Sequence, residues 1–303
     1  MKKRTLALVC ALTLGALTLT ACGGGSGETA QSSAPAQTQA AQESEASTQE
    51  AGGETAQTEE KGTVTVAATP VPHAEILEAA KPLMEEKGWT LEVVEFTDYV
   101  QPNEVVESGD IDANYFQHIN YMESYNAEKG THLVSAGEIH YEPLGIYPGK
   151  ETDLNNISDG AEIAVPNDTT NEGRALLLLQ ENGLITLDPE AGITATAMDI
   201  TENPHNIKIV ELQAEQVART LPDVAFGVVN GNYALQAGLS TSDAVALETA
   251  DSEAIQQYVN VIAVREGNEE NEGIQALVEV LKSDDIKTFI NDTYQGSVVP
   301  YEG

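Results

Sequence analysis

Arg174 is the side chain of this sequence that most clearly suggests a bound ligand. It ends the stretch Val165-Pro-Asn-Asp-Thr-Thr-Asn-Glu-Gly-Arg174 and precedes four consecutive leucines, which predict a helix covered on most sides. Thr169 and Glu172 have the spacing of a capping box, so we expect the helix to open there. Near that end a helix favours negative groups, and a bound anion shared by the free N–H groups and the guanidinium would suit this arginine. A structural ion pair is the alternative, and the stretch alone leaves both open.

Aromatic and amide side chains gather in four stretches that follow predicted strands. With one arginine, such a pocket suits a small zwitterion with an apolar part. If that part is a thioether, each sulfur–aromatic contact would contribute about 0.3–1.5 kcal/mol. Burying an unpaired carboxylate costs more, so the arginine should dominate affinity and the rings selectivity. For any single tyrosine, core packing or exposure is the simpler explanation. The stretches are Phe96-Thr-Asp-Tyr-Val-Gln-Pro-Asn103, Asn114-Tyr-Phe-Gln-His118 with Tyr121, His140-Tyr-Glu-Pro143, and Val229-Asn-Gly-Asn-Tyr233.

The N-terminus has the pattern of a bacterial lipoprotein signal. Met1-Lys-Lys-Arg4 is basic, and the apolar run Thr5 to Thr20 is too short to span a bilayer comfortably. Leu19-Thr-Ala-Cys22 then predicts cleavage after residue 21 and a lipid on Cys22. An ordinary signal or anchor with a chance cysteine is the alternative, but small residues on both sides of Cys22 favour lipidation. We therefore expect a chain held by its lipid on the extracytoplasmic face of the cell membrane.

Composition restricts the chemistry further. Loss of Lys2, Lys3 and Arg4 with the signal takes the basic residues from 14 to 11, against 49 acidic ones. So negative a chain excludes nucleic acid and anionic lipid as general partners. Both cysteines lie at or before residue 22, so the folded part holds neither disulfides nor thiolate metal sites.

Residues 22–62 predict a flexible tether. After the cysteine, residues 23–62 contain no aromatic side chain and no Val, Ile, Leu or Met, and such a segment buries too little apolar surface to fold. The folded part therefore spans residues 63–303, which is long enough for one two-lobed body or two small domains.

Strand and helix patterns alternate along the folded part, which predicts an α/β architecture with largely parallel sheets. Pro82 falls inside the first predicted helix, where we expect a tolerable kink. We expect strands at 63–69, 91–96, 112–116, 132–136, 161–165, 207–211, 224–229 and 258–264. We expect helices at 73–83, 103–107, 121–130, 170–182, 213–219, 231–237, 270–282 and 284–294.

Two loop-like stretches, 139–149 and 238–252, interrupt the alternation and are candidate crossovers between lobes. They divide the chain into a first lobe of 63–142, a second lobe of 143–240, and a return of 241–303 to the first lobe with the C-terminal helices. Two α/β lobes joined by two crossings predict a periplasmic-binding-protein-like fold with the ligand in the cleft between them.

Four stretches, in this order along the chain, resemble the NlpA/MetQ family, the lipoprotein solute receptors of methionine ABC importers. The resemblance covers essentially all of residues 63–303, with the lipoprotein signal in place. It implies the type II version of the two-lobed fold. The stretches are Phe-Thr-Asp-Tyr-Val-Gln-Pro-Asn (96–103), Asp-Ile-Asp-Ala-Asn-Tyr-Phe-Gln-His (110–118), Val-Pro-Asn-Asp-Thr-Thr-Asn-Glu-Gly-Arg-Ala-Leu-Leu-Leu-Leu-Gln (165–180) and Val-Asn-Gly-Asn-Tyr-Ala (229–234).

The resemblance also implies a ligand and roles for seven residues. Arg174 would clamp the carboxylate of methionine or a related amino acid, Asn171 would help to hold the head group, and Asn230 would close from the second lobe. The importer's permease and ATPase complex would be the protein partner, with no cofactor. Tyr115 is left without a role, and Val71 stands where many relatives have Gly. The residues implied to line the side-chain pocket are Tyr99, Phe116, His118 and Tyr121.

Three other functions remain open. A zinc or manganese receptor would need histidine ligands, and the histidines show no HxxxH or HxH spacing, so we expect no metal. A receptor for another small amino acid or a methionine dipeptide would use the same scaffold. An enzyme is disfavoured because no nucleophile elbow or cysteine accompanies Arg174. The histidines are His73, His118, His132, His140 and His205.

Overall fold

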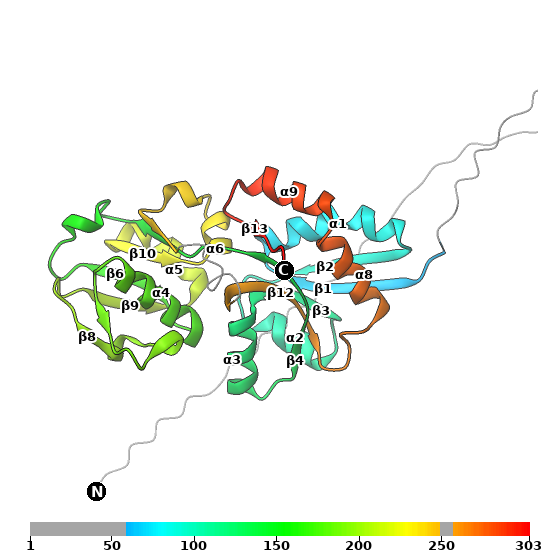
Figure 1. The fold of residues 1–303 in the computed structure, drawn as a ribbon, viewed down its shortest axis with the longest axis horizontal. Coiled ribbons are helices and arrows are strands. Elements are labelled where there is room, and N and C mark those ends of the chain that lie inside the picture. Colours follow the sequence, from blue (N-terminus) through cyan, green and yellow to red (C-terminus); the bar gives the residue numbers. More distant parts are fainter. Residues whose placement is uncertain (1–58, 249–256) are drawn as a thin grey trace, which may run out of the picture. The chain divides into compact units, whose positions relative to one another are not determined.

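Strands and helices alternate along the folded chain as the hydrophobic pattern predicts. The computed structural model, which describes residues 59–248 and 257–303, contains two larger β-sheets with helices packed on them (Figure 1). The signal, Cys22 and the tether up to residue 58 lie outside the described residues. Among the helices of the described part, none is long and apolar enough to cross a membrane.

The first sheet has six strands in the order β13-β4-β12-β3-β1-β2. β1 pairs in parallel with both β2 and β3, so these three strands end at the same edge. β12 returns antiparallel to β3 and β4, late in the chain. The strands are β1 (Gly62–Ala68), β2 (Trp89–Glu95), β3 (Ala113–His118), β4 (Leu133–Tyr141), β12 (Val259–Arg265) and β13 (Val299–Pro300).

The second sheet has five strands in the order β11-β5-β10-β6-β9. β6 pairs in parallel with β9 and β10, whereas β5 is antiparallel to β10 and β11. Its strands are β5 (Gly145–Pro148), β6 (Glu162–Pro166), β9 (Lys208–Leu212), β10 (Phe226–Val229) and β11 (Ala246–Leu247), and a separate ribbon is formed by β7 (Thr186–Leu187) and β8 (Ile200–Glu202).

Both sheets are therefore mixed, and the prediction of largely parallel sheets was wrong. The parallel pairs arise where a helix separates two strands, as between β1 and β2. Antiparallel pairs arise where the chain crosses between the lobes, since β5 enters the second sheet directly after β4 and β12 re-enters the first, and where β13 returns to β4 after α9. Periodicity identifies strands but does not show the direction in which a returning strand pairs.

Helices cover both sheets, and several of them end as their sequences predict. Gly130 ends α3 with a positive φ of 72°, a conformation that glycine adopts without strain. α1 runs through Pro82, and α1 and α8 pack against each other in the first lobe. The helices are α1 (Glu75–Glu86), α2 (Gln101–Ser108), α3 (Ile119–Lys129), α4 (Thr169–Glu181), α5 (Ala214–Thr220), α6 (Gly231–Gln236), α8 (Glu272–Leu281) and α9 (Asp284–Tyr294).

Helix α4 carries Arg174, and most of its residues are buried. Leu176, Leu178 and Leu179 are buried, as the run of leucines predicts. The predicted capping box is wrong, because Asp168 is the N-cap and its side chain accepts from the backbone N–H of Asn171 at 3.0 Å. Glu172 instead accepts from the backbone N–H of Ala197 at 3.0 Å. Aspartate is as good an N-cap as threonine, and the box pattern did not weigh it.

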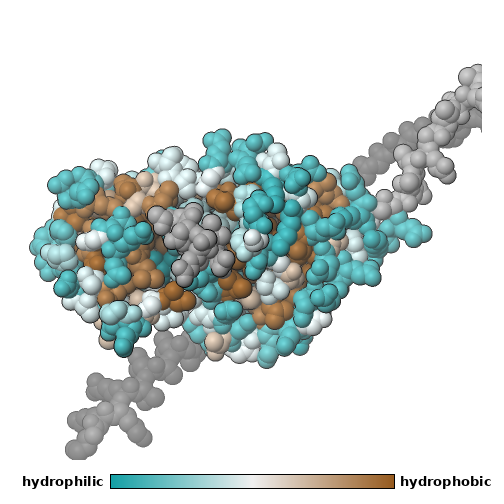
Figure 2. All heavy atoms as spheres, in the orientation of Figure 1, coloured by the Kyte–Doolittle hydropathy of each residue, from teal (hydrophilic) through white to brown (hydrophobic). Residues whose placement is uncertain are grey.

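Each lobe has its own apolar core, built between its sheet and its helices. The second sheet extends beyond the predicted lobe boundary at residue 240, because β11 pairs with β5 and carries the sheet as far as Leu247. On the face shown in Figure 2, hydrophilic side chains cover much of the surface and hydrophobic areas interrupt them. This agrees with the strongly acidic composition.

Candidate ligand-binding site

A narrow pocket lies where parallel strands of both sheets end. β3 from the first lobe leads into it through Phe116 to His118. β6 and β10 from the second lobe lead into it through α4 and Asn230. Carboxyl ends of parallel strands are the usual place for ligands in α/β sheets. All seven residues predicted from the sequence line this pocket, whose walls are Tyr99, Phe116, Gln117, His118, Tyr121, Glu142, Asn171, Arg174, Asn230, Gly231, Asn232 and Asn260.

Arg174 lines the pocket and is also ion-paired. Its Nε donates to the two carboxylate oxygens of Glu248 at 2.9 and 3.2 Å, and its Nη2 donates to the backbone carbonyl of Glu142 at 2.9 Å. The guanidinium carbon lies 4.1 Å from the ring centre of Tyr258. Nη1 has no acceptor among the described residues. The structural ion pair that the sequence left open is therefore present, and it leaves one edge of the guanidinium for a ligand.

Burial and the ion pair act in opposite directions on this arginine. Burial alone would lower the pKa of Arg174, but the adjacent Glu248 outweighs it and raises that pKa. Burial would raise the pKa of Glu248, and Arg174 outweighs it and lowers that pKa. Both groups are therefore charged near neutral pH, and Arg174 is a fixed cation with an exposed fraction of only 4%.

Asn171 connects three elements of the pocket. Its Oδ1 accepts from His118 Nε2 at 3.1 Å and from Asn230 Nδ2 at 2.8 Å, while Asp168 holds its Nδ2 at 2.9 Å. The backbone N–H of Tyr121 donates to His118 Nδ1 at 3.1 Å, so His118 Nε2 carries the proton. Burial lowers the pKa of His118 to about 3, with a further contribution from Arg174. His118 is therefore a neutral donor.

Aromatic rings form the apolar wall of the pocket. The ring of Tyr99 lies 5.6 Å from that of Phe116 and 5.6 Å from that of Tyr121. Across the lobes, the ring of Tyr233 lies 4.9 Å from Tyr99, whose hydroxyl donates to Asn232 Oδ1 at 2.5 Å. The predicted clustering of rings is confirmed as a spatial arrangement.

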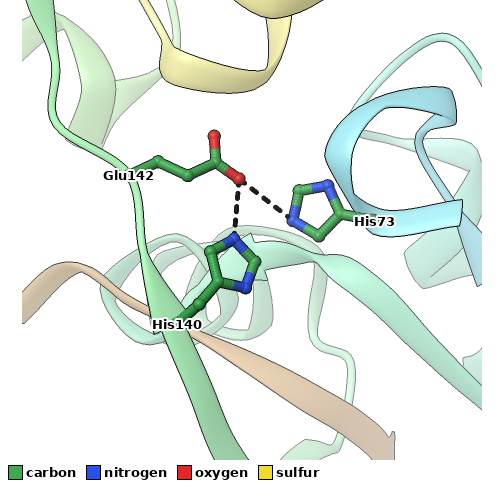
Figure 3. Close-up of side chains that lie close together, drawn as sticks. All are labelled: His73, His140 and Glu142. Carbon is green, nitrogen blue, oxygen red and sulfur yellow. Dashed lines mark hydrogen bonds and ion pairs between the residues drawn. The ribbon is translucent and has the colours of Figure 1, made fainter. Parts of the chain in front are cut away.

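Glu142 is the principal pocket residue that the sequence analysis missed. It follows β4 in the first crossover, with 6% of its surface exposed. One carboxylate oxygen, Oε1, lies 2.8 Å from His140 Nε2 and 3.3 Å from His73 Nε2 (Figure 3). The other oxygen points away from both rings. The only signal in the sequence was its place in the His140–Pro143 stretch.

The histidines beside Glu142 do not supply it with positive charge. Burial lowers the pKa of His73 to about 4 and that of His140 to about 3, so both rings are neutral at pH 7. Burial in turn raises the pKa of Glu142. A buried carboxylate without its own cation favours a positively charged ligand group.

Two amide atoms of the pocket wall also lack partners. Asn230 Oδ1 and Asn232 Nδ2 are buried and have no hydrogen-bond partner among the described residues. Unpaired buried polar atoms are rare, because each forgoes about 1–3 kcal/mol of solvation. An acceptor at Asn230 and a donor at Asn232 are suited to the polar head group of a ligand.

His73, His140 and Glu142 are also the group of side chains that could hold a metal ion, since their ligand atoms lie within 4.8 Å of one another. The histidine spacing in the sequence therefore did not reveal this cluster, which forms only in the folded chain. His118 is held by Asn171 instead, and His132 lies at 3.0 Å from Glu107, with 65% of its side chain exposed.

The sequence of the folded part matches the NlpA lipoprotein family over residues 64–302. The chain belongs to the NlpA lipoprotein family. Among curated family members, D-methionine-binding lipoprotein MetQ of Salmonella typhimurium is 42% identical over 229 residues, which cover 74% of this chain and 83% of that protein. Methionine-binding lipoprotein MetQ of Bacillus subtilis is 42% identical over 247 residues, covering 79% of this chain and 88% of the relative.

Solved structures of NlpA-like proteins share the fold. A lipoprotein of Ruminococcus gnavus is 63% identical with a TM-score of 0.78, over 79% of this chain and 99% of the other. A nutrient-binding protein of Burkholderia cenocepacia, solved bound to methionine, is 43% identical with a TM-score of 0.75, over 78% and 99% of the two chains. The two-lobed α/β fold expected from the sequence is therefore confirmed.

Proposed function

We propose that this NlpA family member is a lipid-anchored extracytoplasmic receptor that captures methionine, as the L or D form or a close analogue, and delivers it to an ABC importer. The observation that carries the proposal is the single pocket in which a buried guanidinium, a buried carboxylate and a wall of aromatic rings face the same space. These are the complements of a carboxylate, an ammonium group and a thioether side chain. The relatives named for methionine support the same ligand.

Each part of the ligand has a proposed partner. Arg174 binds the carboxylate through its free Nη1 edge, and Glu142 with Asn230 Oδ1 receives the ammonium group. Asn171 keeps Asn230 and His118 in register. The apolar side chain lies among rings, and its proposed neighbours are Tyr99, Phe116, His118 and Tyr121.

Transport follows from closure of the lobes. A ligand that contacts both lobes stabilises the closed arrangement by its differential affinity for it, and the closed receptor then docks on the permease and ATPase complex. Cys22 and the tether, which lie outside the described residues, hold the receptor near the importer. We infer a binding role without catalysis, in keeping with one relative named as a binding lipoprotein and another named as a substrate-binding protein.

Calorimetric titration of the purified protein with L-methionine, D-methionine, leucine and zinc chloride tests this function. We expect saturable binding of at least one methionine enantiomer, weaker binding of leucine, and no displacement of methionine by zinc. Arg174→Ala should abolish measurable methionine binding, whereas Arg219→Ala, at an exposed position on α5, should stay within a few-fold of wild type. Methionine affinity retained in Arg174→Ala would remove the proposed carboxylate site.

A further inference from the structure

The buried histidines His73 and His140 do not line the pocket, yet both rings face one oxygen of Glu142 (Figure 3). They come from different elements: His73 from the helical turn Pro70–Ala74 and His140 from β4. Both rings are at most 1% exposed. Two aromatic bases at such depth need a reason beyond filling space.

The hydrogen bonds fix the protonation of both rings. An ionised carboxylate only accepts, so Nε2 of His140 carries the proton that it donates to Glu142, and Nε2 of His73 donates its proton to Asn260 Oδ1 at 3.1 Å. The remaining Nδ1 atoms must then accept, from the hydroxyl of Thr69 at 2.7 Å in His73 and from the hydroxyl of Tyr115 in His140. His73 Nε2 also lies 3.3 Å from Glu142 Oε1, so the ring stands beside the carboxylate. Every atom of this network is therefore assigned a donor or acceptor role.

The same network orients the carboxylate. His140 donates to Oε1 at 2.8 Å and His73 lies 3.3 Å from it, which leaves Oε2 on the side away from the rings, where it approaches α6. A Cβ built on Gly231 would lie 2.8 Å from Glu142 Oε2, so only glycine permits this approach. Glu142 itself sits on the crossover and lines the pocket.

We propose that His73 and His140 are positioning residues, which hold Glu142 ionised and turned so that its second oxygen receives the ammonium group of the ligand. This inference rests on the proposed function. The donor His140 and the neutral ring of His73 beside it orient the carboxylate without neutralising it, so the ammonium group of the ligand supplies the positive charge. Charged histidines would cancel the selectivity for an ammonium group. Thr69 and Tyr115 act one step further out, by holding each ring in the required tautomer.

The test compares methionine with methylthiobutanoate, which is methionine without its ammonium group. His140→Leu removes the donor to Glu142, and His73→Leu removes the neighbouring ring and its bond to Asn260; each should weaken methionine binding by about tenfold. Binding of methylthiobutanoate should change by less than about threefold on the same scale, because that ligand makes no use of Glu142. His73→Gln and His140→Gln retain an N–H donor and should recover most of the loss. His132→Leu, at the exposed histidine, is the matched control and should affect neither ligand.

Gentler variants cover the case in which a leucine variant does not fold. Tyr115→Phe and Thr69→Val leave the rings in place and remove only the hydroxyl that fixes each tautomer. We expect a loss of about threefold for methionine alone, the share of one weakened hydrogen bond.

Three outcomes would overturn the inference. Equal losses of affinity for both ligands would show that the histidines are merely structural. Unchanged methionine binding would show that they do not position Glu142. Zinc binding that displaces methionine and disappears in the leucine variants would make the cluster a metal site. If the wild-type protein bound no methionine at all, the proposed function itself would fail, which is a different result from any of these.

Discussion

At the residue scale, the site combines two buried charges of opposite sign in different situations. Arg174 has an internal partner in Glu248, while the two histidines beside the Glu142 carboxylate are neutral. A zwitterion supplies what each lacks, a carboxylate for the free edge of Arg174 and a cation for Glu142. Because Glu248 already offsets the arginine, the pocket does not favour ligands of net negative charge.

Ionisation of Glu142 should make methionine binding depend on pH. Burial raises its pKa in the free protein, and the ligand's ammonium group lowers it again on binding. Binding is therefore full above the raised pKa and weakens as the pH falls through it, starting above pH 4.5, the ordinary value for glutamate. Calorimetry between neutral and acidic pH should show this decline. The Glu142→Gln variant should bind more weakly at neutral pH and show a flat profile.

Other groups around Glu142 do not produce the same profile. His73 and His140 take up protons only near pH 4 and pH 3, and Arg174 stays charged throughout. Burial raises the pKa of each surrounding tyrosine, so these rings stay neutral. A decline that persists in Glu142→Gln would assign the titration to another group. The tyrosines that face this region are Tyr99, Tyr115 and Tyr294.

Residue types in the sequence predicted the seven pocket residues but not the two carboxylates near Arg174, Glu142 and Glu248. Arg174 was conspicuous because a cation near a helix N-terminus in a very acidic chain needs an anion. In the structure, Glu248 is one such anion. It lies 74 positions away in the sequence, so no local pattern could reveal it. Glu142 escaped notice partly for the same reason, since His73, one of the two histidines beside it, comes from the distant helical turn Pro70–Ala74.

At the element scale, the N-terminus of α4 sets the position of Asn171. Asp168 caps the helix and holds both the backbone N–H and the side-chain Nδ2 of Asn171. Asn171 in turn contacts His118 and Asn230 from its other side. The cap thus serves the helix and the pocket together.

Replacing Asp168 should therefore lower stability and affinity together. Asp168→Ala removes an N-cap, which costs about 1 kcal/mol of unfolding free energy, and releases Asn171. Asn271→Ala is the matched control, because Asn271 caps α8 through the N–H groups of Gly273 and Ile274, away from the pocket. Denaturant unfolding should show similar losses for both variants, and titration should show weaker methionine binding for Asp168→Ala alone. Equal affinities would mean that the cap has no part in binding.

Element types were largely readable from the sequence, whereas their pairing was not. The leucine run of α4 and the glycine end of α3 follow directly from local patterns. The ribbon of β7 and β8 was not expected, because its strands are too short to show a period. Strand direction depends on where a distant segment returns, as β12 shows.

At the scale of the whole molecule, contacts between the lobes surround the pocket. The hydroxyl of Tyr99 in the first lobe donates to Asn232 in the second, and that of Tyr233 donates to the backbone carbonyl of Thr97 at 3.1 Å. Thr169 on α4 donates to Glu128 on α3 at 2.6 Å. These bonds form only when the lobes are together, so they contribute to the closed state and not to either lobe alone.

Loss of one such bond should lower the affinity for methionine without lowering the stability of either lobe. Tyr99→Phe keeps the ring and removes the bond to Asn232, so we expect methionine affinity to fall by about two- to tenfold, as for one hydrogen bond. Tyr294→Phe loses a comparable bond to Glu75 inside the first lobe and should lower thermal stability while leaving affinity unchanged. If Tyr294→Phe lowered the affinity for methionine and Tyr99→Phe did not, the bond from Tyr99 to Asn232 would have no part in stabilising the closed state.

The most direct test of the account is a crystal structure of this protein grown with methionine. We predict the ligand in the pocket between the lobes, with its carboxylate on Arg174 Nη1, its ammonium group on Glu142 Oε2, and its thioether among Tyr99, Phe116 and Tyr121. Methionine bound elsewhere, or bound in the pocket with its ammonium group away from Glu142, would contradict the account.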